Sequence, residues 1–135
     1  MRKFETGATR DVDHSKYDYE GFVSPYVMQA YGAYMHFNRH TVNGIRDSDN
    51  WQKGIPQDVY IKSGWRHFFD WWSEHRGIPT KEGIVWALCA VLFNVQGYLH
   101  EFLKRNPGAL EKAIAAAEAR RHKSWGKLNG VRKKK

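Results

Sequence analysis

Nine residues near the middle of the chain, Gly64 to Trp72, constrain its fold more than any other segment. Their order is Gly-Trp-Arg-His-Phe-Phe-Asp-Trp-Trp, so five of the nine are aromatic. On a helix with about 3.6 residues per turn, the aromatic side chains fall on one broad arc. Arg66, His67 and Asp70 fall on the other arc, and Glu74 extends this polar stripe. The segment predicts an amphipathic helix whose polar face either carries a site or is simply solvated.

Residues that start and stop helices divide the rest of the chain. Ser24-Pro25, Pro56, Thr80 and Asn106-Pro107 are typical helix starts. No stretch alternates apolar and polar residues for long enough to predict a strand. We therefore predict an all-α fold, a small antiparallel bundle of about four helices with an irregular N-terminal segment. The predicted helices span about 25–39, 57–75, 81–105 and 107–122, and residues 40–55 form a loop.

The segment 81–105 is apolar on nearly every side, which predicts the central helix of the bundle. Its narrow stripe of small and polar residues is Ala87, Ala90, Asn94, Gly97 and Glu101. Small residues allow close packing of a neighbouring helix, with Asn94 as a hydrogen-bonded core residue. The alternative is that Asn94 faces the same site as His67 and Asp70.

The net charge of +8 belongs to the end of the chain. Residues 120–135 contain eight Lys or Arg residues and no acidic residue, whereas residues 1–119 carry fourteen of each sign. We predict a single α-helical domain over 1–119 and a basic, flexible tail over 120–135. The tail is either a solvated terminus or an arm that binds phosphate groups, so nucleic acid is expected to bind only through it.

Cysteine content and hydropathy indicate a cytoplasmic protein. Cys89 is the only cysteine, which excludes an intramolecular disulfide and favours a reducing compartment. The N-terminus has no apolar signal segment. The longest apolar run, 84–95, has about twelve residues, and a membrane span needs about 20. We therefore expect no membrane association.

His67 and Asp70 lie one helical turn apart, so the carboxylate can orient the imidazole as a general base, or both can bind a divalent cation. Glu74 adds an oxygen ligand that suits Mg²⁺ or Mn²⁺. We identify His67 and Asp70 as candidate catalytic residues. Asn94 is a further candidate beside this site. The candidate metal ligands are His67, Asp70, Glu74 and Glu101.

The loop Asn50-Trp51-Gln52-Lys53-Gly54 combines an indole with an amide and an ammonium group. These groups can stack a nucleobase and neutralise a phosphate, although Trp51 can equally anchor the loop on the core. The irregular segments add the cations Arg10, Lys16 and Arg46. The sequence lacks GxxxxGK[ST], GxGxxG, HExxH and GxSxG motifs, which disfavours the common kinase, dinucleotide-binding, zincin and α/β-hydrolase classes.

Together these residues resemble a phage-rich family of small proteins, the dATP/dGTP diphosphohydrolase N-terminal domain family. The resemblance covers about residues 7–103, and the NWxxG spacing followed by Arg66-His67 is its most specific part. It implies a helical fold similar to all-α nucleotide pyrophosphohydrolases. It also implies metal-dependent hydrolysis of purine deoxynucleoside triphosphates in the host cytoplasm. The matching positions are Gly7, Ala8, Arg10, Lys16, Ser24, Pro25, Asn50, Trp51, Gly54, Arg66, His67 and Asn94.

The chain departs from this pattern at the metal site. All-α pyrophosphohydrolases use paired ExxE and ExxD carboxylates on facing helices, whereas the segment 81–105 here offers only Asn94 and Glu101. Four functional classes follow, and one of them is a purely structural interaction module, which exposed aromatic residues on the helix 57–75 would support. The first is a Mg²⁺- or Mn²⁺-dependent hydrolase that binds nucleotide through Arg10, Lys16, Asn50, Trp51, Lys53, Arg66 and Asn94. The second is a protein that sequesters a nucleotide or a nucleotide-derived signal without cleaving it. The third is a nucleic-acid accessory protein that acts through the tail, and a homo-oligomer is expected for any of them.

Overall fold

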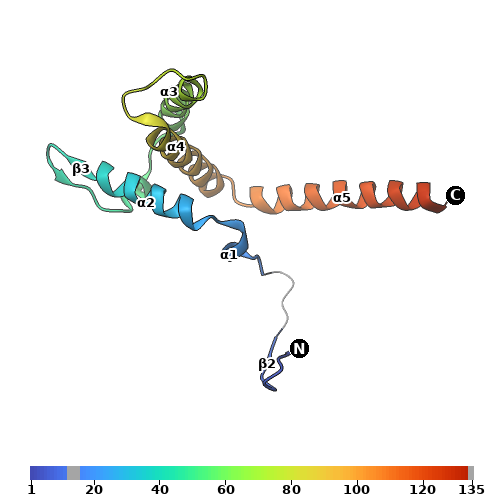
Figure 1. The fold of residues 1–135 in the computed structure, drawn as a ribbon. Coiled ribbons are helices and arrows are strands. Elements are labelled where there is room, and N and C mark those ends of the chain that lie inside the picture. Colours follow the sequence, from blue (N-terminus) through green and yellow to red (C-terminus); the bar gives the residue numbers. More distant parts are fainter. Residues whose placement is uncertain (12–15, 134–135) are drawn as a thin grey trace.

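The computed structural model describes residues 1–11 and 16–133, with side chains described up to residue 127. It is 67% helical, which confirms a small, mostly α-helical fold with an irregular N-terminal segment. Figure 1 shows α3 and α4 packed side by side, α2 against α4, and α5 projecting away from them. The helices are α1 (Tyr19–Phe22), α2 (Pro25–Asn38), α3 (Gln57–His75), α4 (Gly83–Arg105) and α5 (Ala109–Lys133), and a 3-10 turn, η1, spans Asn50–Lys53.

The boundaries of α2, α3 and α4 agree with the predicted helices to within about two residues. The cap predicted at Ser24 is present, since its hydroxyl accepts a hydrogen bond from the amide of Val27 at 3.3 Å. Thr80 also acts near the start of α4, where its hydroxyl accepts from the amide of Gly83 at 3.3 Å. The terminal residues of these helices were therefore readable from the sequence.

Two short antiparallel strand pairs were not predicted. In the N-terminal segment, β1 (Arg2–Lys3) pairs with β2 (Thr9–Arg10). After α2, β3 (His40–Thr41) pairs with β4 (Gly44–Ile45) around a two-residue turn. Gly44 has φ +120°, in the region that favours glycine. Each strand has two residues, which is too short for an alternating pattern to reveal.

The last helix is longer than predicted. It continues to Lys133 rather than ending near residue 122. The basic segment contains no proline and several good helix formers, so nothing in it stops the helix. Within the described part of the chain, α3 with α4 is the most extensive helix pair, followed by α2 with α4.

The core is small and lies between α2 and α4. Its buried residues Tyr34, Cys89 and Ala90 contact Trp86 and Phe93 among other half-buried neighbours. The contact between α3 and α4 runs along the predicted stripe of small and polar residues on α4, and all five residues of the stripe are buried. Asn94 donates a hydrogen bond to the carbonyl of Ala90 at 2.8 Å, as the packing interpretation expects.

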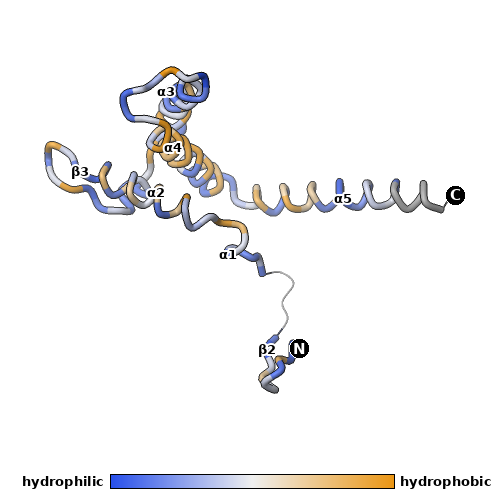
Figure 2. The backbone as a smooth tube through the Cα atoms, in the orientation of Figure 1, coloured by the Kyte–Doolittle hydropathy of each residue, from blue (hydrophilic) through white to orange (hydrophobic). Residues whose placement is uncertain are grey.

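The aromatic arc of α3 does not pack on α4. Tyr60 and Gly64 contact α4 instead, while Trp65 is 66% exposed and Phe69 58% exposed. The reason is steric, because the small-residue stripe of α4 receives Tyr60 where Gly97 has no side chain. Figure 2 shows α4 apolar along most of its length.

By length and composition, α4 qualifies as a helix that could cross a membrane, judged over an apolar window of 18 residues. The apolar run of about twelve residues counted in the sequence contains Asn94 and ends at Val95, before Gln96. The core helix of a soluble protein meets the same criterion, and 28% of that window is buried in this fold. Most of this apolar segment of α4 is therefore not buried in the single chain.

Candidate functional site

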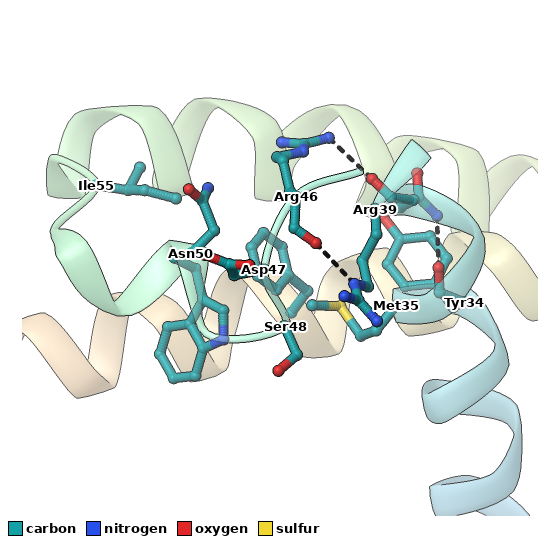
Figure 3. A pocket seen from close by; sticks show the side chains of 11 residues that line it. Tyr34, Met35, Arg39, Arg46, Asp47, Ser48, Asn50 and Ile55 are labelled. Atoms are coloured by element: carbon teal, nitrogen blue, oxygen red, sulfur yellow. Dashed lines mark hydrogen bonds between the residues drawn. The ribbon is translucent and has the colours of Figure 1, made fainter. Parts of the chain in front are cut away.

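A pocket of about 160 Å³ lies between the end of α2, the β3–β4 hairpin, η1 and α4 (Figure 3). It joins segments that are distant in the sequence, with Phe93 of α4 on one side and Trp51 of η1 on another. Two of the predicted nucleotide-binding residues, Asn50 and Trp51, line it. The complete lining is Tyr34, Met35, Asn38, Arg39, Arg46, Asp47, Ser48, Asn50, Trp51, Ile55 and Phe93.

The hairpin brings two arginines to the pocket. Arg39 precedes β3 and Arg46 follows β4, so they are the next pair beyond the strand register, and the amide of Arg46 donates to the carbonyl of Arg39 at 2.9 Å. Arg39 Nε donates to the carbonyl of Arg46 at 2.7 Å, and Arg46 Nη2 donates to that of Asn38 at 2.9 Å. Each guanidinium has five N–H donors, so these bonds orient the groups without using all of their donors.

Trp51 anchors its loop on the core, as one of the two interpretations of the motif expects. Its ring packs edge-on against the imidazole of His100, with 4.8 Å between ring centroids, which anchors η1 on α4. It also lines the pocket and is only half-buried. A half-exposed indole fixed at one edge still offers an apolar surface to a planar ligand.

The charged residues of the pocket are Arg39, Arg46 and Asp47, so its lining is net positive. Tyr34 lies at its inner side, and burial raises the pKa of this phenol, with smaller contributions from Glu82, Cys89 and Tyr31. The phenol therefore stays neutral at physiological pH. Cations, amides and an indole around one pocket suit an anionic ligand that also carries a planar group.

The size of the pocket limits what it encloses. Pockets that enclose a whole small molecule measure about 300–1,000 Å³, whereas this one measures about 160 Å³. It therefore has room for one part of a nucleotide, and the remainder would lie along the surface beside Trp51.

The other predicted nucleotide-binding residues lie elsewhere. Lys53 is exposed in η1, Arg10 is exposed in β2, and Lys16 is exposed before α1. Arg66 is exposed on α3 and does not line the pocket. Asn94 is 5% exposed, and it borders a different cavity between α3 and α4.

The predicted metal ligands are not brought together. Among the described residues, no group of three or more His, Cys, Asp or Glu side chains could hold a metal ion. Glu74 instead accepts two hydrogen bonds of 2.8 Å from the amide and hydroxyl of Thr80, which lower the pKa of its carboxyl. Glu101 lies 4.0 Å from Arg105 on its own helix. Within the described part of the chain, the four candidate ligands are therefore not gathered at one point.

His67 and Asp70 are both half-buried on α3. The Nδ1 atom of His67 is buried without a hydrogen-bond partner among the described residues, and neither residue lines the pocket. The predicted catalytic pair is therefore separate from Asn50 and Trp51, two of the residues predicted to bind nucleotide.

Sequence reasoning missed Arg39 at the pocket and His100 beneath Trp51. Asn43-Gly44 is a strong hairpin signal, but with these two residues as the turn it pairs Thr41 with Arg46. The observed turn is Val42-Asn43, and only this register places Arg39 opposite Arg46. No sequence signal indicates His100, because its contact with Trp51 depends on how η1 folds back on α4.

No family model, no curated protein and no solved structure matches this chain. The resemblance to the diphosphohydrolase family therefore rests on the quoted motifs alone.

Proposed function

We propose that the chain binds a purine nucleotide at the pocket between α2, the hairpin and α4. The observation that carries the proposal is the pair Arg39 and Arg46 beside Trp51 and Asn50. In this arrangement the guanidinium groups meet the phosphates, because planar N–H donors match phosphate oxygens in pairs. The indole of Trp51 stacks the base, and the amide of Asn50 bonds a polar edge of the base or sugar.

The reaction proposed with this binding is divalent-metal-dependent hydrolysis of a purine deoxynucleoside triphosphate, as the motif resemblance implies. The carboxylates of one chain do not form a metal site, so no catalytic step is assigned to His67 or Asp70. This separation favours a second candidate function, capture of a nucleotide or nucleotide-derived signal without cleavage.

Binding is tested by thermal unfolding of the full chain against dATP, dGTP, dCTP and dTTP, with and without Mn²⁺. We expect the purine nucleotides to raise the Tm by several degrees, as ligand at about 100 times its Kd adds about 2.7 kcal/mol. Trp51→Ala and Arg46→Lys are expected to remove most of this shift. No shift with any nucleotide would contradict the proposal.

Two matched substitutions control for loss of an indole or a guanidinium. Trp125→Ala removes a half-exposed indole on α5, and Arg66→Gln removes a guanidinium on α3 that does not line the pocket. Both variants are expected to keep the nucleotide shift. Chromatography of the nucleotide after incubation with Mn²⁺ then separates the two functions, since hydrolysis produces a new species and capture leaves the triphosphate intact.

A further inference from the structure

An apolar groove of about 800 Å³ lies on the flank of α4 that α2 leaves open. Its floor is Gly64 of α3 and Asn94 of α4, with 3.5 Å between Asn94 Cβ and a Cβ built at Gly64. We call this cavity the α3–α4 groove. Its walls are formed by Ile61, Trp65, Phe68, Val95, Leu99 and Phe102.

The groove is uncharged and its walls are exposed. The six wall residues are between 41% and 66% exposed. No Asp, Glu, Lys or Arg residue lines it, and Asn94 is the one amide on its floor. A site for a nucleotide, a metal ion or nucleic acid requires charged or multiple polar groups, so the groove is unsuited to all three.

We propose that a second copy of this chain packs into the α3–α4 groove and completes the hydrophobic core as a symmetric homodimer. The accessible surface of the chain is 11,805 Å², whereas a compact monomer of its 15.8 kDa mass exposes about 7,300 Å². The projecting α5 and the N-terminal segment account for part of the excess. The residues of the groove walls belong to neither of these segments, so exposed surface on α3 and α4 also contributes to the excess accessible area.

The exposed area of the groove face approaches what a standard dimer interface buries on each partner. At about 150–200 Å² per side chain, exposed by about half, the six walls contribute about 500 Å². Leu92, Tyr98 and Trp72 are also 39% to 50% exposed on the same two helices. They raise the face toward the roughly 800 Å² per partner of a standard interface.

The shape of the face favours a copy of itself as the occupant. A two-fold axis places the same patch on both sides of the interface, so the patch must contain both ridges and hollows. Here Gly64 provides the hollow, and Trp65 beside it provides a ridge that is 66% exposed. The nucleotide pocket shares no lining residue with the groove, so it stays open in this dimer.

The remaining helix of the same chain is a poorer occupant. α5 begins after Pro107-Gly108 and leads away from α3 and α4, as Figure 1 shows. Its first half is rich in alanine and its second half is basic. It therefore offers few large apolar side chains to a groove of this size.

The test is the molar mass of the full chain in solution, measured by light scattering during gel filtration at about 50 µM. We expect 31.6 kDa, twice the 15.8 kDa of one chain. Val95→Glu and Leu99→Arg place a charge on the groove walls and are expected to weaken dimerisation at least 100-fold. Both side chains are more than half exposed, so their replacement leaves the fold of the single chain intact by circular dichroism.

Val59→Glu is the matched control, because Val59 is 52% exposed on α3 but does not line the groove, and it should leave the dimer intact. A wild-type chain that is monomeric at 50 µM overturns the proposal, as does a dimer that both groove variants preserve. Cosedimentation with phosphatidylcholine–phosphatidylglycerol vesicles covers the membrane alternative. A monomer that binds vesicles and loses this binding in Val95→Glu assigns the groove to lipid and also overturns it.

Discussion

Tyr60 reaches α4 at a position where that helix has no side chain. It is 2% exposed, and a Cβ built at Gly97 would overlap its ring. Burial raises the pKa of Tyr60, and the nearby carboxylate of Glu101 raises it further, so the phenol remains neutral. This one contact fixes which face of α3 lies against α4, and through it the position of every other side chain on α3.

Gly97→Ala is therefore expected to destabilise the fold. The added methyl group forces the Tyr60 ring to move within a buried seam, and overpacking of this kind costs about 1–3 kcal/mol. Urea unfolding followed by circular dichroism measures the loss. Gly32→Ala is the control, because Gly32 lies in α2 with nothing within 4 Å of the new Cβ. That change should be neutral or stabilise by about 0.5–1 kcal/mol, and equal losses in both variants would contradict the explanation.

Glu74 holds the end of α3 to the start of α4 through its two hydrogen bonds to Thr80. These bonds lower the pKa of the Glu74 carboxyl in the folded chain below its unfolded value of about 4.3. The resulting stability is present above the unfolded pKa and is lost as the pH falls through the lowered folded pKa.

Glu74→Gln is expected to lower the Tm at pH 7 and to reduce the loss of Tm between pH 5 and pH 3. Thermal unfolding across that range measures both effects. Glu118→Gln, at an exposed position on α5, is expected to change neither. If Glu74→Gln retained the acid sensitivity of the wild type, other carboxylates would account for it.

At the scale of elements, local chemistry predicted where helices occur but not how they pack. Ser24-Pro25 marks the start of α2 because capping depends on neighbouring residues alone. Thr80 was predicted to cap α4, but the helix begins at Gly83 with Glu82 at its N-cap position. The aromatic residues of α3 predict which of its faces is buried. In the structure, the face that carries Tyr60 and Gly64 lies against α4 instead. Amphipathicity measures how apolar a face is, whereas packing also depends on whether the opposing surface leaves room.

The candidate site was also predicted only in part, because packing decides which residues meet there. Asn50 and Trp51 were found because their loop motif is contiguous in sequence. Arg39 was missed because it joins the pocket only through strand pairing. The sequence prediction grouped Arg66 and Asn94 with Asn50 and Trp51, although Arg66 and Asn94 lie on other surfaces. The spacing of residues along a helix does not indicate which neighbouring element each side chain faces.

The helix α5 is expected to be energetically separate from the rest. It begins after Gly108, where φ is +88°, and projects from the other helices (Figure 1). Deleting residues 109–135 should therefore shift the Tm of residues 1–108 by less than about 2 °C, because almost no buried apolar surface is lost. Thermal unfolding of both chains by circular dichroism measures this shift. A large loss of stability would show that α5 packs on the other helices in solution.

At the scale of the whole molecule, stability and assembly are coupled. A single chain buries only a few large side chains and leaves an apolar face open, so the proposed dimer supplies the missing part of the core. If the folded monomer is much less stable than the dimer, unfolding includes dissociation. The Tm must then depend on protein concentration.

Each tenfold increase in concentration is expected to raise the Tm of the wild-type chain by several degrees, because it adds about 1.4 kcal/mol to dimer stability. Scanning calorimetry between about 2 and 200 µM measures this slope. Val95→Glu should abolish the slope and melt at one lower temperature, since its charge faces the groove, whereas Val59→Glu should keep the slope. A flat wild-type response would show that each chain is stable alone, with its aromatic arc exposed to solvent for a reason other than self-association.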